Sequence, residues 1–210
     1  MSEATLRRLY EARRNIVLVQ LAERIHGLLA TYLEGAPRID RISARAKGVD
    51  RFMAKAAKLS KGTPKYSDPI NQIQDQVGAR VVTFYLSDVD RVKQVIDAYF
   101  RPIEERRIVP DSVSEFGYEG HHYVLFVPND VIDDDWERGD YPDFFELQIK
   151  TLFQHAWAEA GHDVGYKEFV PLIDDQKRKL AFTAAQSWGA DMIFNDLFRD
   201  VNDQDQQGQD

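Results

Sequence analysis

Alternation of apolar and polar side chains over residues 144–150 is the feature of this sequence that most constrains its fold. Successive side chains of a β-strand point to opposite faces, so the pattern predicts a strand with one face on a core and the other toward a cleft or water. The apolar set is Phe145, Leu147 and Ile149, and the polar set is Glu146, Gln148 and Lys150. A carboxylate, an amide and an ammonium group in one row can hold a metal–nucleotide complex and a reacting hydroxyl. An ordinary amphipathic edge strand is the alternative.

The rest of the chain alternates between helical and extended patterns. Apolar residues at helical spacing predict helices at residues 3–33, 43–60, 88–100, 151–165 and 174–199. Runs of β-branched and aromatic residues predict strands at 79–85, 101–109, 121–127 and 143–150. This order predicts an α+β fold, in which helices flank a mixed β-sheet. The length of 210 residues suits a single domain over residues 1–200, followed by a flexible tail at 201–210.

Composition limits the cell compartments in which the protein could work and the partners it could bind. The chain has no cysteine, which excludes disulfides and thiolate metal sites and fits a reducing compartment. No apolar run approaches the roughly 18–20 residues that span a membrane, so we expect a cytoplasmic protein without membrane contact. The net charge of −8 argues against a protein that coats DNA non-specifically.

A basic segment stands out against this acidic background. Between Arg38 and Lys65 the chain has nine basic residues and two acidic ones. The helix predicted at 43–60 would carry a basic ridge on one face, formed by Lys47, Arg51, Lys55 and Lys58. Such a ridge favours binding of phosphates, and a solvated helix face is the alternative.

Three further segments carry candidate functional groups. Asp75 comes just before a predicted strand that carries Arg80, so it could hold a metal beside a cation, although aspartates are also common in turns. Tyr118 lies between two glycines and could stack on a base or cover the core as a half-buried lid. In the helix predicted at 151–165, His155, Glu159 and His162 share one face. They could bind a metal, but hydrogen bonds to the edge of the sheet are favoured.

Five short motifs, each weak alone, together resemble the synthetase domain of the RelA/SpoT family. In order they are Arg45-Ala46-Lys47 with Lys55, Asp75 to Arg80, Gly117 to His122, Glu146 to Thr151, and Trp157-Ala158 with His162 to Lys167. The resemblance covers about residues 41–167. It implies a nucleotidyltransferase-like synthetase fold and an enzyme that moves pyrophosphate from ATP to the 3′-hydroxyl of GTP or GDP, with Mg²⁺ as cofactor. The product would be guanosine penta- or tetraphosphate, an alarmone.

The resemblance also implies a role for each matching residue. Donor binding would fall to Arg45, Lys47, Lys55 and Arg80, with the two arginines on either side of the adenine. Asp75 would hold Mg²⁺, and Glu146 would share the metal or accept the proton of the attacking hydroxyl. The acceptor side would be formed by Tyr118, His122, Gln148 and Lys150.

Departures from the family pattern leave the acceptor open. The family commonly has Ser at the position of Arg51, Arg at that of Lys150, and Arg or Gln at that of Glu119. A lysine common in the family is also missing from residues 109–115. Adenine nucleotides and tRNA 3′ ends therefore stay open as acceptors, and so do a homo-oligomer and an RNA or antitoxin partner.

Two other functional classes compete with the synthetase. One is a catalytically silent domain that binds nucleotides or RNA, which has no need to keep both Asp75 and Glu146. The other is a metal hydrolase using the histidines of the 151–165 helix.

Overall fold

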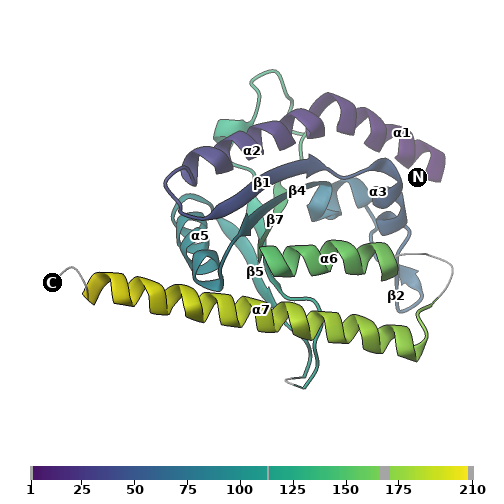
Figure 1. Cartoon of the computed structure of the whole chain (residues 1–210). Coiled ribbons are helices and arrows are strands. Elements are labelled where there is room, and N and C mark those ends of the chain that lie inside the picture. The colour runs from purple at the N-terminus through teal and green to yellow at the C-terminus, as the bar shows by residue number, and fades with distance from the viewer. Residues whose placement is uncertain (1, 113, 166–170, 208–210) are drawn as a thin grey trace.

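The computed structural model describes residues 2–112, 114–165 and 171–207. A five-stranded sheet has the order β1-β4-β7-β6-β5, with helices on both faces (Figure 1). Its strands are β1 (Ile39–Ala46), β4 (Val77–Thr83), β7 (Phe144–Thr151), β6 (Gly120–Phe126) and β5 (Pro102–Ile108). β4 and β7 are parallel and the other pairs are antiparallel, so the predicted α+β fold with a mixed sheet is confirmed.

The hydrophobic core lies between one face of the sheet and two helices. The first predicted helix forms α1 (Glu3–Arg13), a π-helical turn (Arg14–Leu18) and α2 (Val19–Tyr32), and α2 lies along β1 (Figure 1). α5 (Leu86–Tyr99) contacts β4 and β7. As the alternation predicts, Phe145, Leu147 and Ile149 are completely buried in this core. The polar face of β7 is therefore free to form a site on the other side.

The helix predicted at 43–60 is wrong over residues 43–48 and 57–60. The chain instead forms β1 up to Ala46 and then a short helix, α3 (Val49–Ala56). Ile42, Ala44 and Ala46 turn their side chains inward at a spacing of two, and pairing of β1 with β4 under α2 outweighs the local preference for a helix. The helical ridge is therefore broken. Lys47 precedes α3, and Lys58 follows it at the start of the hairpin β2 (Leu59–Ser60) and β3 (Thr63–Pro64).

Smaller elements connect the sheet to the C-terminal helices. Two helical turns, α4 (Pro69–Gln72) and Gln74–Gln76, lead into β4, and another (Asn129–Val131) follows β6. α6 (Leu152–Gly165) continues directly from β7 and packs against α7 (Asp174–Gln207). α7 continues through Gln207, so residues 201–207 are helical where a tail is predicted, and residues 208–210 lie outside the described residues. We propose that residues 1–200 form one domain, which a single five-stranded sheet supports.

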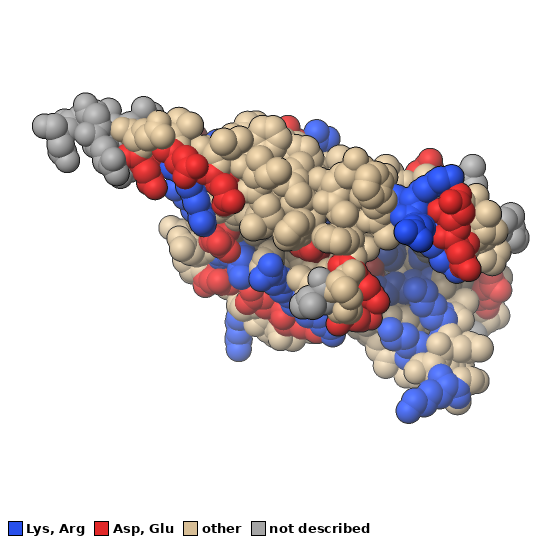
Figure 2. All heavy atoms as spheres, turned by 60° about the horizontal axis from the view of Figure 1, so that its bottom comes forward, with Lys and Arg blue, Asp and Glu red and all other residues tan. Residues whose placement is uncertain are grey.

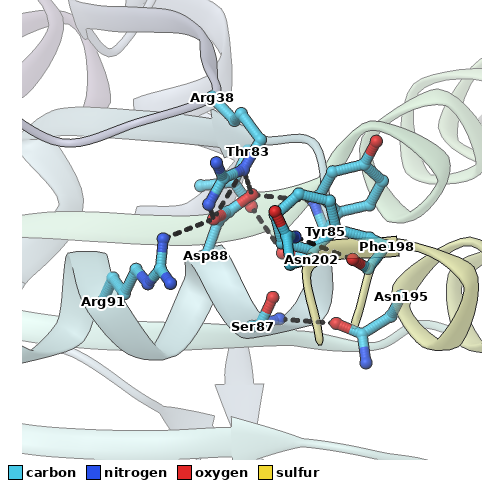
Figure 3. Close-up of polar contacts among 9 residues, drawn as sticks. All are labelled: Arg38, Thr83, Tyr85, Ser87, Asp88, Arg91, Asn195, Phe198 and Asn202. Carbon is cyan, nitrogen blue, oxygen red and sulfur yellow. Dashed lines mark hydrogen bonds and ion pairs between the residues drawn. The ribbon is translucent and has the colours of Figure 1, made fainter. Parts of the chain in front are cut away.

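α7 is anchored to the body of the protein at several points along its length. In its second half, Asn195 Oδ1 accepts a hydrogen bond from the backbone N–H of Ser87 in the first turn of α5 at 2.9 Å (Figure 3). The Phe198 ring stacks on the Tyr85 ring, with 4.4 Å between the ring centroids, and lies under the guanidinium of Arg38 (Figure 3). Arg38 in turn forms a bidentate ion pair with the buried Asp88. Nearer its start, the indole N–H of Trp157 in α6 donates to Thr183 at 3.1 Å.

A second set of contacts joins the middle of α7 to the end of β7 and the start of α6. The Thr151 hydroxyl donates to Asp191 Oδ2 at 2.8 Å, and the Ser187 hydroxyl donates to the carbonyl of Phe153 at 2.8 Å. The last residue of the central strand is therefore held by the C-terminal helix.

Candidate active site

A cleft of about 780 Å³ opens on the polar face of the sheet. Its walls come from the end of β1, the start of α3, the turn before β4, and the polar sides of β4 and β7. It brings together six of the predicted site residues, which are Arg45, Lys47, Asp75, Arg80, Glu146 and Gln148. The register explains the grouping, because Gly78 pairs with Glu146 and Arg80 pairs with Gln148 in the parallel β4–β7 ladder.

Asp75 is held by two lysines at the floor of this cleft. Both Lys47 Nζ and Lys55 Nζ lie 2.8 Å from Asp75 Oδ2. Burial favours the neutral acid, but the two ammonium groups more than offset it and hold the pKa of Asp75 below its ordinary value, so the side chain is ionised at neutral pH. The other oxygen, Oδ1, is buried and has no hydrogen-bond partner among the described residues.

Glu146 is the second carboxylate of the cleft. Burial opposes its ionisation, but a hydrogen bond from His122 lowers the pKa of Glu146 below the ordinary value despite the nearby charge of Asp75. Glu146 Oε1 lies 3.0 Å from His122 Nδ1 and accepts a longer contact of 3.4 Å from the Gln148 amide. Within the described residues, no hydrogen bond reaches Glu146 Oε2.

Arg80 extends from β4 and is held by α6. Its Nη1 donates to Glu159 Oε1 at 2.8 Å and lies 3.2 Å from His155 Nδ1. His155 and Glu159 therefore contact a residue of the sheet, Arg80, from α6. The described residues also contain no group of three or more His, Asp or Glu side chains arranged to hold a metal. The positioning role of Glu159 is missed by sequence reasoning, because spacing along a helix does not identify a partner on a strand.

Tyr118 and Lys150 meet at the other end of the row of polar residues on β7. The Lys150 side chain is 3% exposed, and its Nζ lies 4.6 Å from the centroid of the Tyr118 ring. Burial first, and the charge of Arg80 second, lower the pKa of Lys150 to about 8. Gly120 allows this close packing, since a Cβ there would lie 3.0 Å from the Tyr118 hydroxyl. The half-buried Tyr118 thus packs beside polar residues of the site.

The two carboxylates are suited to a hard divalent cation. Asp75 and Glu146 are close enough for each charge to affect the other, and Asp75 Oδ1 has no protein partner among the described residues. Mg²⁺ is commonly bound by one or two carboxylates, with waters and substrate phosphates completing its six oxygen ligands. Lys47 and Lys55 add two positive charges beside Asp75.

The fifth motif, which ends at Lys167, lies partly outside the described residues. Trp157 and Ala158 are in α6, as predicted, but Tyr166 and Lys167 lie outside the described residues.

Both a family model and a curated relative match this chain. Residues 44–170 match the region found in RelA / SpoT proteins. Over 141 residues the chain is 27% identical to GTP pyrophosphokinase YjbM of Bacillus subtilis (strain 168). That stretch spans 66% of this chain and 62% of the relative, which is less than two thirds of the relative's length.

Solved structures show the same fold. Small alarmone synthetase 1 of Bacillus subtilis superposes with a TM-score of 0.70 at 23% identity, covering 93% of this chain and 95% of that one. The same synthetase bound to its product pppGpp gives a TM-score of 0.72 at 22% identity, with 91% and 98% covered. A GTP pyrophosphokinase family protein from Streptococcus pneumoniae gives 0.68 at 24% identity, with 87% and 88% covered.

Proposed function

This chain belongs to the RelA/SpoT family, and from that premise we propose that it transfers pyrophosphate from ATP to the 3′-hydroxyl of GTP or GDP in the presence of Mg²⁺. One observation carries the proposal. Two ionised carboxylates, Asp75 and Glu146, lie in one cleft beside the cations that a polyphosphate needs.

The donor nucleotide occupies the part of the cleft between β1 and β4. Arg45 and Arg80 come from these neighbouring strands, and their guanidinium planes can enclose an adenine ring. Arg45 makes no ion pair within the described residues, whereas Arg80 is held in place by Glu159. A synthetase of this fold has been solved bound to AMPCPP, which supports an adenine nucleotide as donor.

The donor's phosphates compete with Asp75 for two lysines. Lys47 and Lys55 both contact Asp75 Oδ2, and phosphate oxygens are equally good acceptors for ammonium groups. With phosphates on the two lysines, Asp75 would be the residue that holds Mg²⁺, through Oδ1, which has no hydrogen-bond partner among the described residues. Mg²⁺ held by Asp75, with Glu146 nearby in the same cleft, would neutralise the phosphate charge that builds up during transfer.

Glu146 accepts the proton of the attacking 3′-hydroxyl. Its Oε2 is free of hydrogen bonds within the described residues, so it can receive this proton as the 3′-oxygen bonds to the β-phosphorus of ATP. The bond from the β-phosphorus to the oxygen bridging it to the α-phosphorus breaks, and AMP leaves with that oxygen.

The acceptor nucleotide sits on the side of the cleft formed by β6 and β7. The Tyr118 ring provides a surface for the base, with the Lys150 ammonium near the same ring. His122 and Gln148 are paired across the β6–β7 ladder and lie between this surface and Glu146. The synthetase solved with its product pppGpp supports a guanine nucleotide here.

A specific observation also favours a second acceptor class, an RNA 3′ end. Five exposed cations continue from the cleft along α3 and the β2–β3 hairpin without an ion pair among the described residues: Arg45, Arg51, Lys58, Lys61 and Lys65. Lys and Arg side chains also gather at the end of the molecule away from the projecting tip of α7 (Figure 2). These cations come from three successive segments, the end of β1, α3 and the β2–β3 hairpin, and such a track suits a continuous phosphate backbone.

Product analysis separates these functions. The protein is incubated with Mg²⁺, ATP labelled in its β-phosphate, and one acceptor at a time: GTP, GDP, AMP, or an RNA with a free 3′-hydroxyl. We expect AMP together with a guanine nucleotide that has gained two phosphates. Labelling of the RNA or AMP alone would replace the acceptor, and no AMP release with any acceptor would reject pyrophosphate transfer.

A further inference from the structure

Three side chains from separate segments form a continuous hydrogen-bonded row beside the cleft. Tyr118 precedes β6, His122 is in β6, and Glu146 is in β7. The Tyr118 hydroxyl lies 2.6 Å from His122 Nε2, and His122 Nδ1 lies 3.0 Å from Glu146 Oε1. The antiparallel register produces the row, because His122 pairs directly with Gln148 and Glu146 is two residues from Gln148 on the same face of the sheet.

The direction of each hydrogen bond follows from the charges of the end groups. Glu146 is ionised and can only accept, so His122 Nδ1 must carry a proton. At the other end, burial first and the charge of Glu146 second raise the pKa of Tyr118, which keeps its hydroxyl protonated. That hydroxyl can donate to His122 Nε2. When it does so, Nε2 is the acceptor and the imidazole proton shared with Glu146 is on Nδ1.

Both ring nitrogens of His122 are therefore used by the protein itself. An imidazole has only two hydrogen-bonding atoms, and each already has a partner in the row. Direct recognition of an acceptor by His122 would require one of these two short contacts to break. This geometry argues against the acceptor-binding role that the resemblance implies for His122.

We infer that His122 is a positioning residue, which orients Glu146 through Nδ1 while the Tyr118 hydroxyl holds Nε2. The inference rests on the proposed function of Glu146 as proton acceptor. With Oε1 fixed by the Nδ1–H donor, Oε2 is the oxygen left to meet the 3′-hydroxyl. Tyr118 then has two separate tasks, since its ring contacts the base while its hydroxyl orders the imidazole.

The tautomer can be measured without any catalytic reaction. In ¹⁵N-histidine-labelled protein at neutral pH and without nucleotides, the ¹⁵N shifts of the imidazole distinguish a protonated Nδ1 from a protonated Nε2. His122→Asn identifies the His122 signals by removing them. We expect the Nδ1–H form in the parent, and in Tyr118→Phe a changed shift of Nε2 with Nδ1 still protonated, because Glu146 still accepts from Nδ1. A parent signal from the Nε2–H form would overturn the inference.

Two substitutions test which nitrogen matters for turnover. His122→Asn places an amide N–H near the position of Nδ1, whereas His122→Gln places its amide near Nε2. We expect kcat to stay within a few-fold of the parent in His122→Asn and to fall by about 10–100-fold in His122→Gln, as is typical when the partner that orients a ligand or base is lost. The acceptor KM should change little in either variant. Equal losses of kcat, or a loss confined to the acceptor KM, would overturn the inference.

A double-mutant cycle tests the role of the Tyr118 hydroxyl. Tyr118→Phe keeps the ring, so in the parent it should lower kcat by about tenfold with little change in acceptor KM. In the His122→Asn background no nitrogen remains for the hydroxyl to bind, and Tyr118→Phe should then have no further effect on kcat. Additive losses would contradict the coupling.

A neighbouring histidine provides the matched control. His121 lies on the opposite face of β6, so His121→Asn makes the same chemical change outside the cleft. It should leave kcat and the His122 tautomer unchanged. If the parent makes no alarmone but shows the Nδ1–H tautomer, the proposed function fails while the arrangement of the row stands.

Discussion

At the residue scale, the central feature is a pair of carboxylates that stay ionised in a partly buried cleft. Two ammonium groups stabilise the charge of Asp75, and His122 stabilises that of Glu146. Neither Asp75 Oδ1 nor Glu146 Oε2 has a protein partner within the described residues, and these are the atoms that the proposed chemistry uses. The protein therefore keeps its reactive oxygens available.

Removing either charge should abolish turnover. Asp75→Asn and Glu146→Gln keep size and hydrogen bonding but remove the negative charge that holds the metal or accepts the proton. We expect Mg²⁺-dependent product formation to fall on the order of 10³-fold or more in each variant. The melting temperature should change little, because neither residue belongs to the hydrophobic core.

Asp50→Asn is the control for this experiment. Asp50 lies at the rim of the same cleft, is largely exposed and pairs with Arg7, so its substitution should leave activity near the parent level. Near-normal activity in Glu146→Gln would reject its catalytic role, and a collapsed melting curve would assign the carboxylates to the fold instead.

The ring of Tyr118 should determine acceptor affinity. Tyr118→Ala removes the stacking surface, which is worth roughly 1–3 kcal/mol per base, so the acceptor KM should rise about 5- to 150-fold. Tyr118→Phe keeps the ring and should leave this KM close to that of the parent. Steady-state kinetics at saturating ATP give both values, and an unchanged KM in Tyr118→Ala for every acceptor would make Tyr118 a purely structural residue.

At the scale of elements, β1 and α3 divide the basic segment into parts with different roles. Lys47 lies in the connection between them and Lys55 in the last turn of α3, and both reach Asp75. Lys58 lies beyond the helix, where its side chain is exposed. In the proposed function, Lys47 and Lys55 therefore bind the phosphates of the donor and Lys58 does not.

Lysine substitutions should separate these parts. Lys47→Ala and Lys55→Ala should each weaken ATP binding by about tenfold or more, since each removes a charge-assisted contact to phosphate. Lys58→Ala is the matched control and should bind free ATP like the parent. Calorimetric titration with ATP gives the Kd, and unchanged affinity in both cleft variants would remove the lysines from the donor site.

The contact between α7 and β7 should make stability depend on pH. Burial first, then the charge of Glu119, raises the pKa of Asp191 to about 7 from an unfolded value near 4. The folded state thus holds a proton that the unfolded state releases, so the free energy of unfolding falls as pH rises from about 4 to 7. Above pH 7 the full cost of ionising the buried acid remains.

Asp191→Asn should remove this cost and keep an oxygen that can accept the Thr151 hydrogen bond. In urea unfolding, we expect the stability gain of the variant over the parent to be about 1–2 kcal/mol larger at pH 8 than at pH 5. A gain of the same size at both pH values would show that Asp191 does not titrate in this range.

Sequence patterns were sufficient to predict an element where the local preference of the residues agrees with their packing in the fold. The alternation over residues 144–150 correctly predicts a strand with a buried apolar face and a polar face in a cleft. The same kind of reasoning failed over residues 43–46, where a spacing of four between Ile42 and Ala46 fits a helix and a strand equally well. Pairing with β4 decides that case, and a single sequence does not reveal the partner strand.

The row of Tyr118, His122 and Glu146 was also beyond sequence reasoning. The motifs place these three residues in the same site, but their hydrogen bonds depend on the antiparallel register of β6 and β7. A slip of one residue in that register would move His122 to the opposite face of the sheet. Register is a property of the folded sheet, so the roles of the individual atoms come only from the structure.

At the scale of the whole molecule, α7 presents an apolar stripe to solvent. Four large side chains at helical spacing are more than half exposed: Phe182, Ile193, Leu197 and Val201. Figure 2 shows a broad surface without charged residues between the projecting tip of α7 and the basic end of the molecule. None of the helices in the described parts of the chain is long and apolar enough to cross a membrane.

We propose that a second copy of the chain covers this stripe. Two antiparallel α7 helices can bury identical stripes against each other, and exposed patches of this kind commonly mark interfaces. Light scattering after size exclusion should give at least a dimer for the parent and a monomer for the double variant Ile193→Glu/Leu197→Glu. Arg199→Glu, on another face of α7, should leave the mass unchanged, and a parent that is monomeric at all concentrations would contradict the proposal.

The position of α7 after β7 in the chain also has a consequence for protein synthesis. A ribosome adds about 5–20 residues per second, so the 34 residues of α7 take about 2–7 s to make. During that time every strand of the sheet has been translated, yet Thr151 and the first turn of α5 still lack their partners Asp191 and Asn195. Translation therefore leaves an interval of seconds in which the residues that line the cleft have been made but α7 has not. During that interval α6 lacks the helix that packs against it.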